Sequence, residues 1–224
     1  MVSYTGVNTA SGQTSTIGHG LASAPELVIC KRKNSTYSWS VGSTVIGNFT
    51  TSSVFSLDST AAPATTYAYE WGANPTDSVF TTGYSNRTNI DGGTFIAYCF
   101  HSVDGYCKVG SYVGNGNNSP DGTFVYTGFR PAWVMVKDVT DTSAWVIIDN
   151  KRAEPYNIDT ARIYADDNLA ETALNTNRYM ELFSNGFRVH GNNASSLTNK
   201  WNENGDTFIY LAFAEAPFKF ANAR

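Results

Sequence analysis

Short apolar runs alternate with clusters of Gly, Asn, Ser, Thr and Asp along the whole chain, and this pattern predicts strands joined by turns. The most apolar run, GDTFIYLAFAEAPF at 205 to 218, is rich in β-branched and aromatic residues and is flanked by glycine and proline. Since both of its faces are apolar, we expect it to lie inside a sheet. Only residues 166 to 173, DDNLAETA, have a helical pattern.

Several further runs have the length and composition of strands. They are Glu26 to Lys31, Trp133 to Lys137, the runs that begin near Trp39 and Trp145, SSVFSL at 52 to 57, SVFTT at 78 to 82, MELF at 180 to 183 and GFRV at 186 to 189. Many short strands separated by turn residues predict an all-β fold of antiparallel, jelly-roll-like sandwiches.

The chain contains an internal repeat. DGGTFIAYCF at 91 to 100 superposes on NGDTFIYLAF at 204 to 213, and APELVICKRKNSTYSW at 24 to 39 superposes on RPAWVMVKDVTDTSAW at 130 to 145. SYTGV at 3 to 7 likewise matches SYVGN at 111 to 115. Three colinear matches predict a duplication, with a first β-module at 1–110 and a second at 111–224. The sequence leaves open whether the modules form two sandwiches or share one double sheet.

The repeat also predicts which residues form the core. Large apolar side chains at matched positions are expected to be buried, and they are Trp39, Trp145, Phe95, Ile96, Phe100, Phe208, Ile209 and Phe213. Glu215, at the end of the longest apolar run, aligns with Ser102. We therefore interpret that carboxylate as a variable position and not as a catalytic group.

Composition and charge exclude several classes of protein. Charged residues make up 15% of the 224 residues and the net charge is −4, so nucleic acid is not an expected partner. No apolar segment is long enough for a spanning helix and no export signal precedes the first module, so membrane insertion is not expected. Three cysteines without C-x-x-C spacing indicate buried thiols in a protein that folds in a reducing cytoplasm.

Catalytic and metal-binding motifs are not found. His19, His101 and His190 are far apart in the sequence, and no G-x-S-x-G elbow is present. Carboxylates that could hydrolyse a glycoside are scattered over predicted loops: Asp149, Glu154, Asp159, Asp166, Asp167 and Glu181. We predict that the protein is not an enzyme and has no catalytic residues, no metal site and no cofactor.

Two acidic loops leave calcium binding open. Asp138, Asp141 and Thr142 in KDVTDTS could supply oxygen ligands, as could Asn202 and its neighbours Asn204 and Asp206 in WNENGD. The same residue types close ordinary β-turns, which is the interpretation we favour.

Aromatic residues make up 14% of the chain, with 13 Tyr, 13 Phe and 5 Trp. Most are expected in the cores, but exposed rings can stack on sugars or pack at protein interfaces. Tyr84, Tyr106 and Tyr156 lie in turn-like surroundings and are the interface candidates.

A set of motifs together resembles a known family. These motifs are SYTGV and SYVGN, GFRPAWVMVK, SNGFRV, NENGDTFIYLAFAEAPF and the terminal KFANAR. They resemble a repeated β-module of unknown biochemical function in bacteriophages, especially marine ones, where it ends tail-fibre-like and other virion structural proteins. The resemblance covers essentially the whole chain, most strongly 111 to 224, and brings no catalytic residues with it.

The resemblance implies a non-enzymatic structural protein on the exterior of the virion, made in the host cytoplasm, with a tail-fibre or receptor-binding role. A capsid decoration or cement protein, a carbohydrate-binding lectin and a polysaccharide-degrading enzyme are the alternatives. Expected partners are other virion proteins, a host-surface glycan or receptor, and further copies of the chain in a homo-oligomer such as a trimer. Because the first module begins at Met1, we expect attachment through surfaces of the modules themselves.

Overall fold

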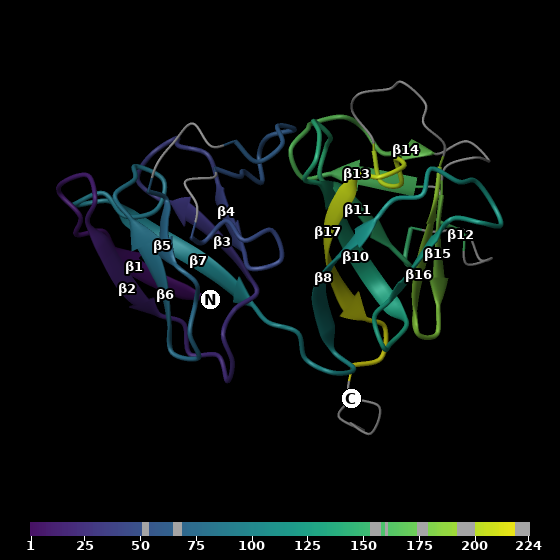
Figure 1. The fold of residues 1–224 in the computed structure, drawn as a ribbon, viewed down its shortest axis with the longest axis horizontal. Coiled ribbons are helices and arrows are strands. Elements are labelled where there is room, and N and C mark those ends of the chain that lie inside the picture. Colours follow the sequence, from purple (N-terminus) through teal and green to yellow (C-terminus); the bar gives the residue numbers. More distant parts are fainter. Residues whose placement is uncertain are drawn as a thin grey trace. The chain divides into compact units, whose positions relative to one another are not determined.

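The computed structural model describes residues 1–50, 54–64, 69–152, 158–159, 161–173, 179–191 and 200–217. The described residues form strands and turns without a helix, and the chain divides into two compact units, Met1–His101 and Ser102–Arg224 (Figure 1). Each sheet contains strands of one unit only, and every ladder between named strands is antiparallel. The protein is therefore a tandem of two β-sandwiches and not one shared double sheet.

The first unit has a four-stranded sheet in the order β1-β7-β3-β4 and a three-stranded sheet in the order β2-β6-β5. The strands of the larger sheet are β1 (Val2–Thr5), β3 (Leu27–Arg32), β4 (Ser40–Ser43) and β7 (Thr94–Phe100). Those of the smaller sheet are β2 (Thr14–Gly18), β5 (Trp71–Ala73) and β6 (Val79–Gly83). Side chains from both sheets meet in one apolar core, which includes Ile17, Val28, Phe80 and Phe95.

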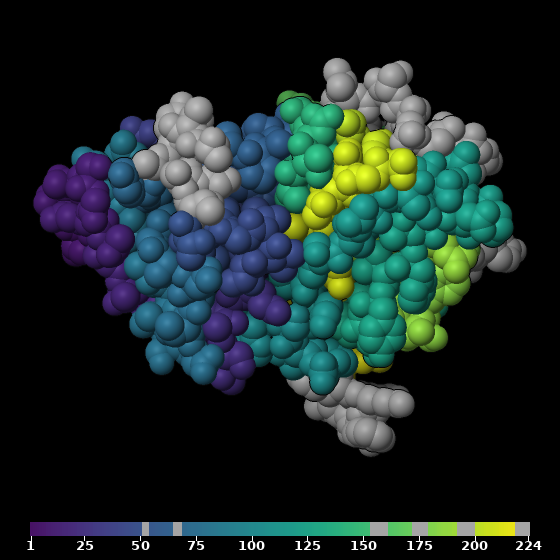
Figure 2. All heavy atoms as spheres, in the orientation of Figure 1, coloured from purple at the N-terminus to yellow at the C-terminus, as the bar shows by residue number. Residues whose placement is uncertain are grey.

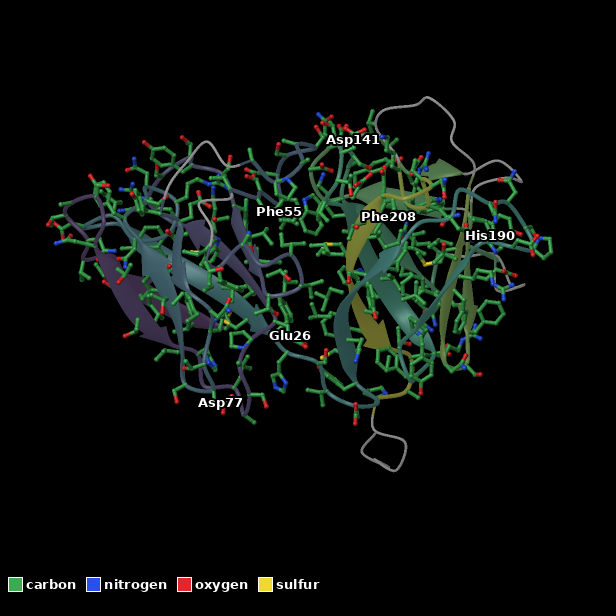
Figure 3. All side chains as sticks on the ribbon, in the orientation of Figure 1. Glu26, Phe55, Asp77, Asp141, His190 and Phe208 are labelled. Atoms are coloured by element: carbon green, nitrogen blue, oxygen red, sulfur yellow. The ribbon has the colours of Figure 1, made fainter. Side chains whose placement is uncertain are left out.

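The second unit has a six-stranded sheet in the order β14-β13-β11-β10-β17-β8 and a four-stranded sheet in the order β12-β15-β16-β9. The first comprises β8 (Cys107–Val113), β10 (Pro131–Asp138), β11 (Val146–Asp149), β13 (Ala161–Tyr164), β14 (Thr172–Ala173) and β17 (Thr207–Ala214). The second comprises β9 (Thr123–Tyr126), β12 (Ile158–Asp159), β15 (Tyr179–Phe183) and β16 (Gly186–His190). Phe208, on β17, lies in the core between these sheets (Figure 3).

The two matched Thr-Phe-Ile segments form interior strands, as their apolar faces predict. β7 lies between β1 and β3, and β17 lies between β10 and β8. Along β7 every second side chain is buried, whereas Phe208 to Ala212 on β17 are buried without interruption. Such a run has no polar face, so β17 could not occupy a solvent-exposed position in a sheet.

The duplication extends from sequence to topology. The order β1-β7-β3-β4 in the first unit is matched by β8-β17-β10-β11 in the second, and β2-β6-β5 is matched by β9-β16-β15. Register agrees as well, because Ile17 pairs with Phe80 in the first unit and Val125 pairs with Phe187 in the second. The repeated motifs therefore occupy equivalent places in two copies of one scaffold.

The glycine of the Ser-Tyr-x-Gly motif is required for the same structural reason in both units. A Cβ on Gly6 would lie 2.1 Å from the carbonyl oxygen of Ile90, and a Cβ on Gly114 would lie 2.2 Å from that of Glu203. Each of these glycines also bonds to the turn before the long strand: Gly92 N donates to Gly6 O at 3.2 Å, and Gly205 N donates to Gly114 O at 2.9 Å. Only a residue without a side chain allows this close approach.

Two expectations from the sequence are corrected. The boundary between the units lies at His101–Ser102 and not at 110, because β8 begins at Cys107 and pairs with β17 along its whole length. Residues 166 to 171 are not helical and Thr172–Ala173 form β14. Asp166 accepts a hydrogen bond from Trp145 N at 3.1 Å, and such side-chain bonds to the backbone compete with an isolated helix of two turns.

The predicted core is correct for half of its members. Trp145, Phe95, Phe208 and Ile209 are buried. The other four are half-buried, and they are Trp39, Ile96, Phe100 and Phe213. Alternation along β7 explains two of them, because Phe95 and Ala97 point into the core and their neighbours do not. Cys30, Cys99 and Cys107 are buried free thiols.

Candidate functional site

The outward face of the sheet β9-β16-β15 in the second unit carries an unusual set of side chains. Val125, Leu182 and Phe187 point inward to the core, so their neighbours along each strand point outward. The register places Phe124 beside Arg188. We call this surface the aromatic face, and its members are Phe124, Tyr126, Glu181, Phe183 and Arg188.

The aromatic rings of this face are open to solvent. Tyr126 is 66% exposed and Phe124 is 41% exposed, although both lie in a regular strand. Phe124 and Phe183 meet edge to face with ring centroids 5.8 Å apart, and the Arg188 guanidinium lies 5.2 Å from the Phe183 ring. In Figure 2 the β15–β16 hairpin, in yellow-green, reaches the surface of the second unit. Large exposed rings on a rigid sheet are typical of contact surfaces.

Gly186 makes room for this packing. It lies between Tyr126 on β9 and Phe183 on β15 in the register of the sheet. A Cβ at this position would be 2.9 Å from Cζ of Phe124 and 2.2 Å from the carbonyl oxygen of Val125. The glycine therefore lets the Phe124 ring lean across the strand toward Phe183.

A pair of opposite charges completes the face. Glu181 Oε2 lies 2.6 Å from His190 Nε2 and 4.0 Å from Arg188 Nη1. Arg188 Nη1 also donates to the carbonyl of Pro120 at 3.2 Å, while its Nε is buried and has no hydrogen-bond partner among the described residues. The carboxylate and the guanidinium are thus held in place, and part of their hydrogen-bonding capacity remains unused.

His190 lies two residues after Arg188 on β16, so it projects to the same side of the sheet and contacts Glu181 at one end of the face. It is fully buried near the end of β16 (Figure 3) and stacks on Tyr179 with ring centroids 4.3 Å apart. A histidine beside a carboxylate can act as an acid-base pair, but that requires contact with a substrate. Because the ring has no exposed surface, the geometry assigns His190 the task of orienting Glu181.

The equivalent face of the first unit is different in chemistry. Thr16 pairs with Thr81 where Phe124 pairs with Arg188, and Gly18 pairs with Val79 where Tyr126 pairs with Gly186. The inward residues of the two units remain alike, so the scaffold is shared and the outward surface is not. The aromatic face is a property of the second unit.

A buried ion pair in the first unit is structural. Arg87 Nε lies 3.1 Å from Glu70 Oε1, and the Arg87 guanidinium also donates to the carbonyl of Trp39 at 3.1 Å. Ser40 donates to the other carboxylate oxygen. Burial raises the pKa of Glu70, and Arg87 and the Ser40 hydroxyl oppose this shift. The network ties the segment before β4 to the rest of the sandwich.

The candidate calcium ligands close turns instead. Asp138 Oδ1 accepts from the backbone N–H groups of Thr140 and Asp141 at 2.8 and 3.0 Å, and Asp141 pairs with Lys200. Asn202 donates to Asn115 and to backbone carbonyls. In the part of the chain that the structure describes, no three His, Cys, Asp or Glu side chains come together in a way that could hold a metal.

Among the acids considered for glycoside hydrolysis, those whose side chains the structure describes do not converge on one site. Arg152 Nε lies 2.6 Å from Asp149, and its Nη1 lies 2.7 Å from Glu171. Glu215 forms an exposed ion pair with Arg130 at 2.8 Å. Glu154 lies outside the described residues. The carboxylates whose contacts are seen belong to separate ion pairs or turns.

Of the three predicted interface tyrosines, the structure describes two, one in each unit. Tyr84 is half-buried in the first unit, and Tyr106 in the second is 39% exposed with its ring edge-on to Phe213. Tyr156 lies outside the described residues. The sequence interpretation missed Phe124 and Tyr126. The repeat aligns His19 with Thr127, and extending this alignment backwards matches Phe124 with Thr16 and Tyr126 with Gly18.

The fold and this site define a class: a duplicated antiparallel β-sandwich with one chemically distinct sheet face. The chain belongs to the family described as domain of unknown function (DUF7483), whose model matches residues 1–217. No curated protein and no solved structure matches the chain. Within the described part of the chain, no helix has the length and hydropathy needed to cross a membrane.

Proposed function

We propose that the protein is a non-enzymatic component of the exterior of a bacteriophage particle, in a tail-fibre or receptor-binding role. The observation that carries the binding role is the aromatic face of the second unit, which the first unit lacks on the same scaffold. The phage setting rests on the resemblance of the motifs SYTGV, SYVGN and NENGDTFIYLAFAEAPF to a repeated β-module of phage virion proteins.

The scaffold suits a binding module. Regular strands hold Phe124 and Tyr126 at fixed positions, so little conformational entropy is lost when a partner covers their rings. An exposed patch of this kind costs solubility unless it has a partner. A receptor-binding protein present in several copies would add such contacts together, and each copy could then bind weakly.

The polar clusters support a role without catalysis. The buried His190 orients a carboxylate, the Glu70–Arg87 pair is enclosed, and Asp138 closes a turn. None of these groups combines an exposed nucleophile with a base, as hydrolysis of a host polysaccharide would require.

Localisation on purified particles tests the proposal. We expect antibodies raised against the recombinant protein to label the tail in electron micrographs, and an excess of the recombinant protein to slow adsorption of the phage to its host. The double variant Phe124→Ala/Tyr126→Ala should lose this competition, whereas Thr16→Ala/Thr81→Ala, on the equivalent face of the first unit, should keep it.

Two outcomes would contradict the proposal. Labelling of the head without any effect on adsorption would identify a capsid decoration protein. Absence of the protein from particles would rule out every virion role.

A further inference from the structure

We propose that the aromatic face binds a neutral glycan, with Phe124 and Tyr126 stacking on pyranose rings and Arg188 and Glu181 bonding to ring hydroxyls. This inference rests on the binding role proposed above and names the class of ligand. It does not depend on the phage setting.

The rings provide the apolar half of the match. A pyranose has an apolar side formed by its axial C–H groups, and a flat aromatic ring is the protein surface that complements it. Tyr126 is the most exposed ring of the face, and Phe124 is fixed beside it by contact with Phe183. Two rings on one strand, two residues apart, point to the same side of the sheet and can serve consecutive sugar units.

The charged pair provides the polar half. Sugar hydroxyls donate and accept, so they are best recognised where donors and acceptors lie next to each other. Arg188 supplies donors from its guanidinium, which is 32% exposed, and Glu181, which is 24% exposed, supplies acceptors. His190 and the carbonyl of Pro120 hold these two groups in place, which reduces the entropy cost of binding.

The balance of charge favours a neutral ligand over an acidic one. The positive charge of Arg188 is accompanied by the negative charge of Glu181 at 4.0 Å, so the face has no excess of positive charge to attract a polyanion. The chain as a whole carries −4. A protein partner is favoured less, because glutamate is depleted at protein interfaces and here Glu181 lies beside Arg188 on the face.

Binding measurements with defined oligosaccharides test the inference. The probes are neutral oligomers of glucose, mannose, galactose and N-acetylglucosamine, together with polygalacturonate as an acidic polymer. We expect the full chain to bind at least one neutral oligomer by calorimetry. Tyr126→Ala and Phe124→Ala should each weaken this binding by about tenfold, as loss of a stacked ring does, whereas Phe124→Tyr should retain it.

The first unit supplies the matched control. Thr16→Ala and Thr81→Ala change the equivalent positions and should leave the affinity unchanged. Arg188→Gln keeps a donor and removes the charge, so it should lower the affinity for a neutral oligomer only a few-fold. Melting temperatures of all variants should remain near that of the parent protein, because the substituted side chains lie outside the core.

Three results would overturn the inference: no neutral oligomer binds, binding persists in Phe124→Ala/Tyr126→Ala, or only the acidic polymer binds. Loss of self-association in Tyr126→Ala, without any glycan binding, would identify the face as an interface between copies of the chain. Glycan binding by a protein that is absent from particles would leave this inference standing and reject the proposed virion role. A protein that competes for adsorption but binds no glycan would support the proposed virion role and reject this inference.

Discussion

The ring of Tyr112 stacks on that of Phe208 with centroids 5.1 Å apart and an interplanar angle of 13°, and its hydroxyl donates to the carbonyl of Trp201 at 2.7 Å. The first unit repeats this arrangement: Tyr4 stacks on Phe95 at 5.2 Å and 17°, and its hydroxyl donates to the carbonyl of Thr88 at 2.6 Å. The tyrosine of the Ser-Tyr-x-Gly motif thus joins the first strand of each unit to its long interior strand and to a loop.

Removing the hydroxyl of Tyr112 or of Tyr4 should lower the stability of the unit that contains it. Tyr112→Phe and Tyr4→Phe keep the stacked ring and leave a buried carbonyl without its donor, so we expect each to lower the free energy of unfolding by about 1 to 2 kcal/mol. Urea denaturation followed by fluorescence measures the change. Tyr37→Phe, at an exposed position, is the control and should be neutral. Equal effects of all three variants would show that these hydrogen bonds contribute nothing.

The two matched tryptophans should contribute differently to the stability of the protein. Trp145 is 1% exposed, and its replacement by alanine should cost about 3 to 5 kcal/mol of stability. Trp39 is half-buried beside the Lys31 ammonium and Tyr98, so Trp39→Ala should cost about 1 to 2 kcal/mol. Thermal and chemical unfolding of both variants tests this order. A larger loss in Trp39→Ala would contradict the observed burial.

Glycines of the repeated motif should not tolerate a methyl group. A Cβ on Gly6 or Gly114 would overlap a backbone carbonyl oxygen, which cannot move as a flexible side chain does. We expect Gly6→Ala and Gly114→Ala to destabilise by about 1 to 3 kcal/mol, the usual cost of overpacking. Gly18→Ala is the matched control, because the nearest atom to its Cβ would be 3.9 Å away. If Gly18→Ala lowered stability as strongly, the cause would be the strand propensity of the residue and not overlap with a carbonyl oxygen.

Asp138 should make stability depend on pH. Burial raises its pKa to about 6, against the effect of two backbone hydrogen bonds and with a further contribution from Asp206. Its pKa in the unfolded chain is about 4, so the folded state binds the proton more tightly and stability rises as pH falls from about 6 to about 4.

The substitution Asp138→Asn isolates this contribution. It keeps an oxygen for the N–H groups of Thr140 and Asp141 and removes the buried charge. We expect the variant to be more stable than the parent near pH 7, by about 1 to 2 kcal/mol, and to lose this part of the pH dependence. The free energy of unfolding of both proteins should be measured from pH 4 to pH 7. The same dependence on pH in the two proteins would refute the raised pKa of Asp138.

The repeat made much of the scaffold predictable. The glycines of SYTGV and SYVGN recur because a side chain at either position would overlap a backbone carbonyl oxygen. The tyrosine of these motifs and the phenylalanine of the Thr-Phe-Ile segments recur because their rings stack on each other in both units. Matching positions did not guarantee matching burial. Trp39 and Trp145 are aligned, yet Trp39 is half-buried and Trp145 is buried. Phe213 lies near the end of β17, where the core no longer encloses it.

The aromatic face could not be recognised from composition or periodicity. TFVY at 123 to 126 alternates aromatic and apolar residues, and both faces of such a strand look suitable for a core. Only the register shows that Val125 is the inward residue and that Arg188 and Glu181 share the outward side. The chemistry of the face arises where β9 pairs with the β15–β16 hairpin, which lies far from it in the sequence, and a linear pattern does not record that these two segments become neighbours.

The register shared by the two units has a practical consequence for engineering. Thr16, Gly18 and Thr81 occupy in the first sandwich the places that Phe124, Tyr126 and Arg188 occupy in the second. They lie outside the core, and a Cβ on Gly18 would make only an ordinary van der Waals contact, 3.9 Å from the carbonyl oxygen of Ser78. The first sandwich therefore offers a second place for the same surface residues: if they were transplanted there, the binding role proposed above would become bivalent without a change to either interior.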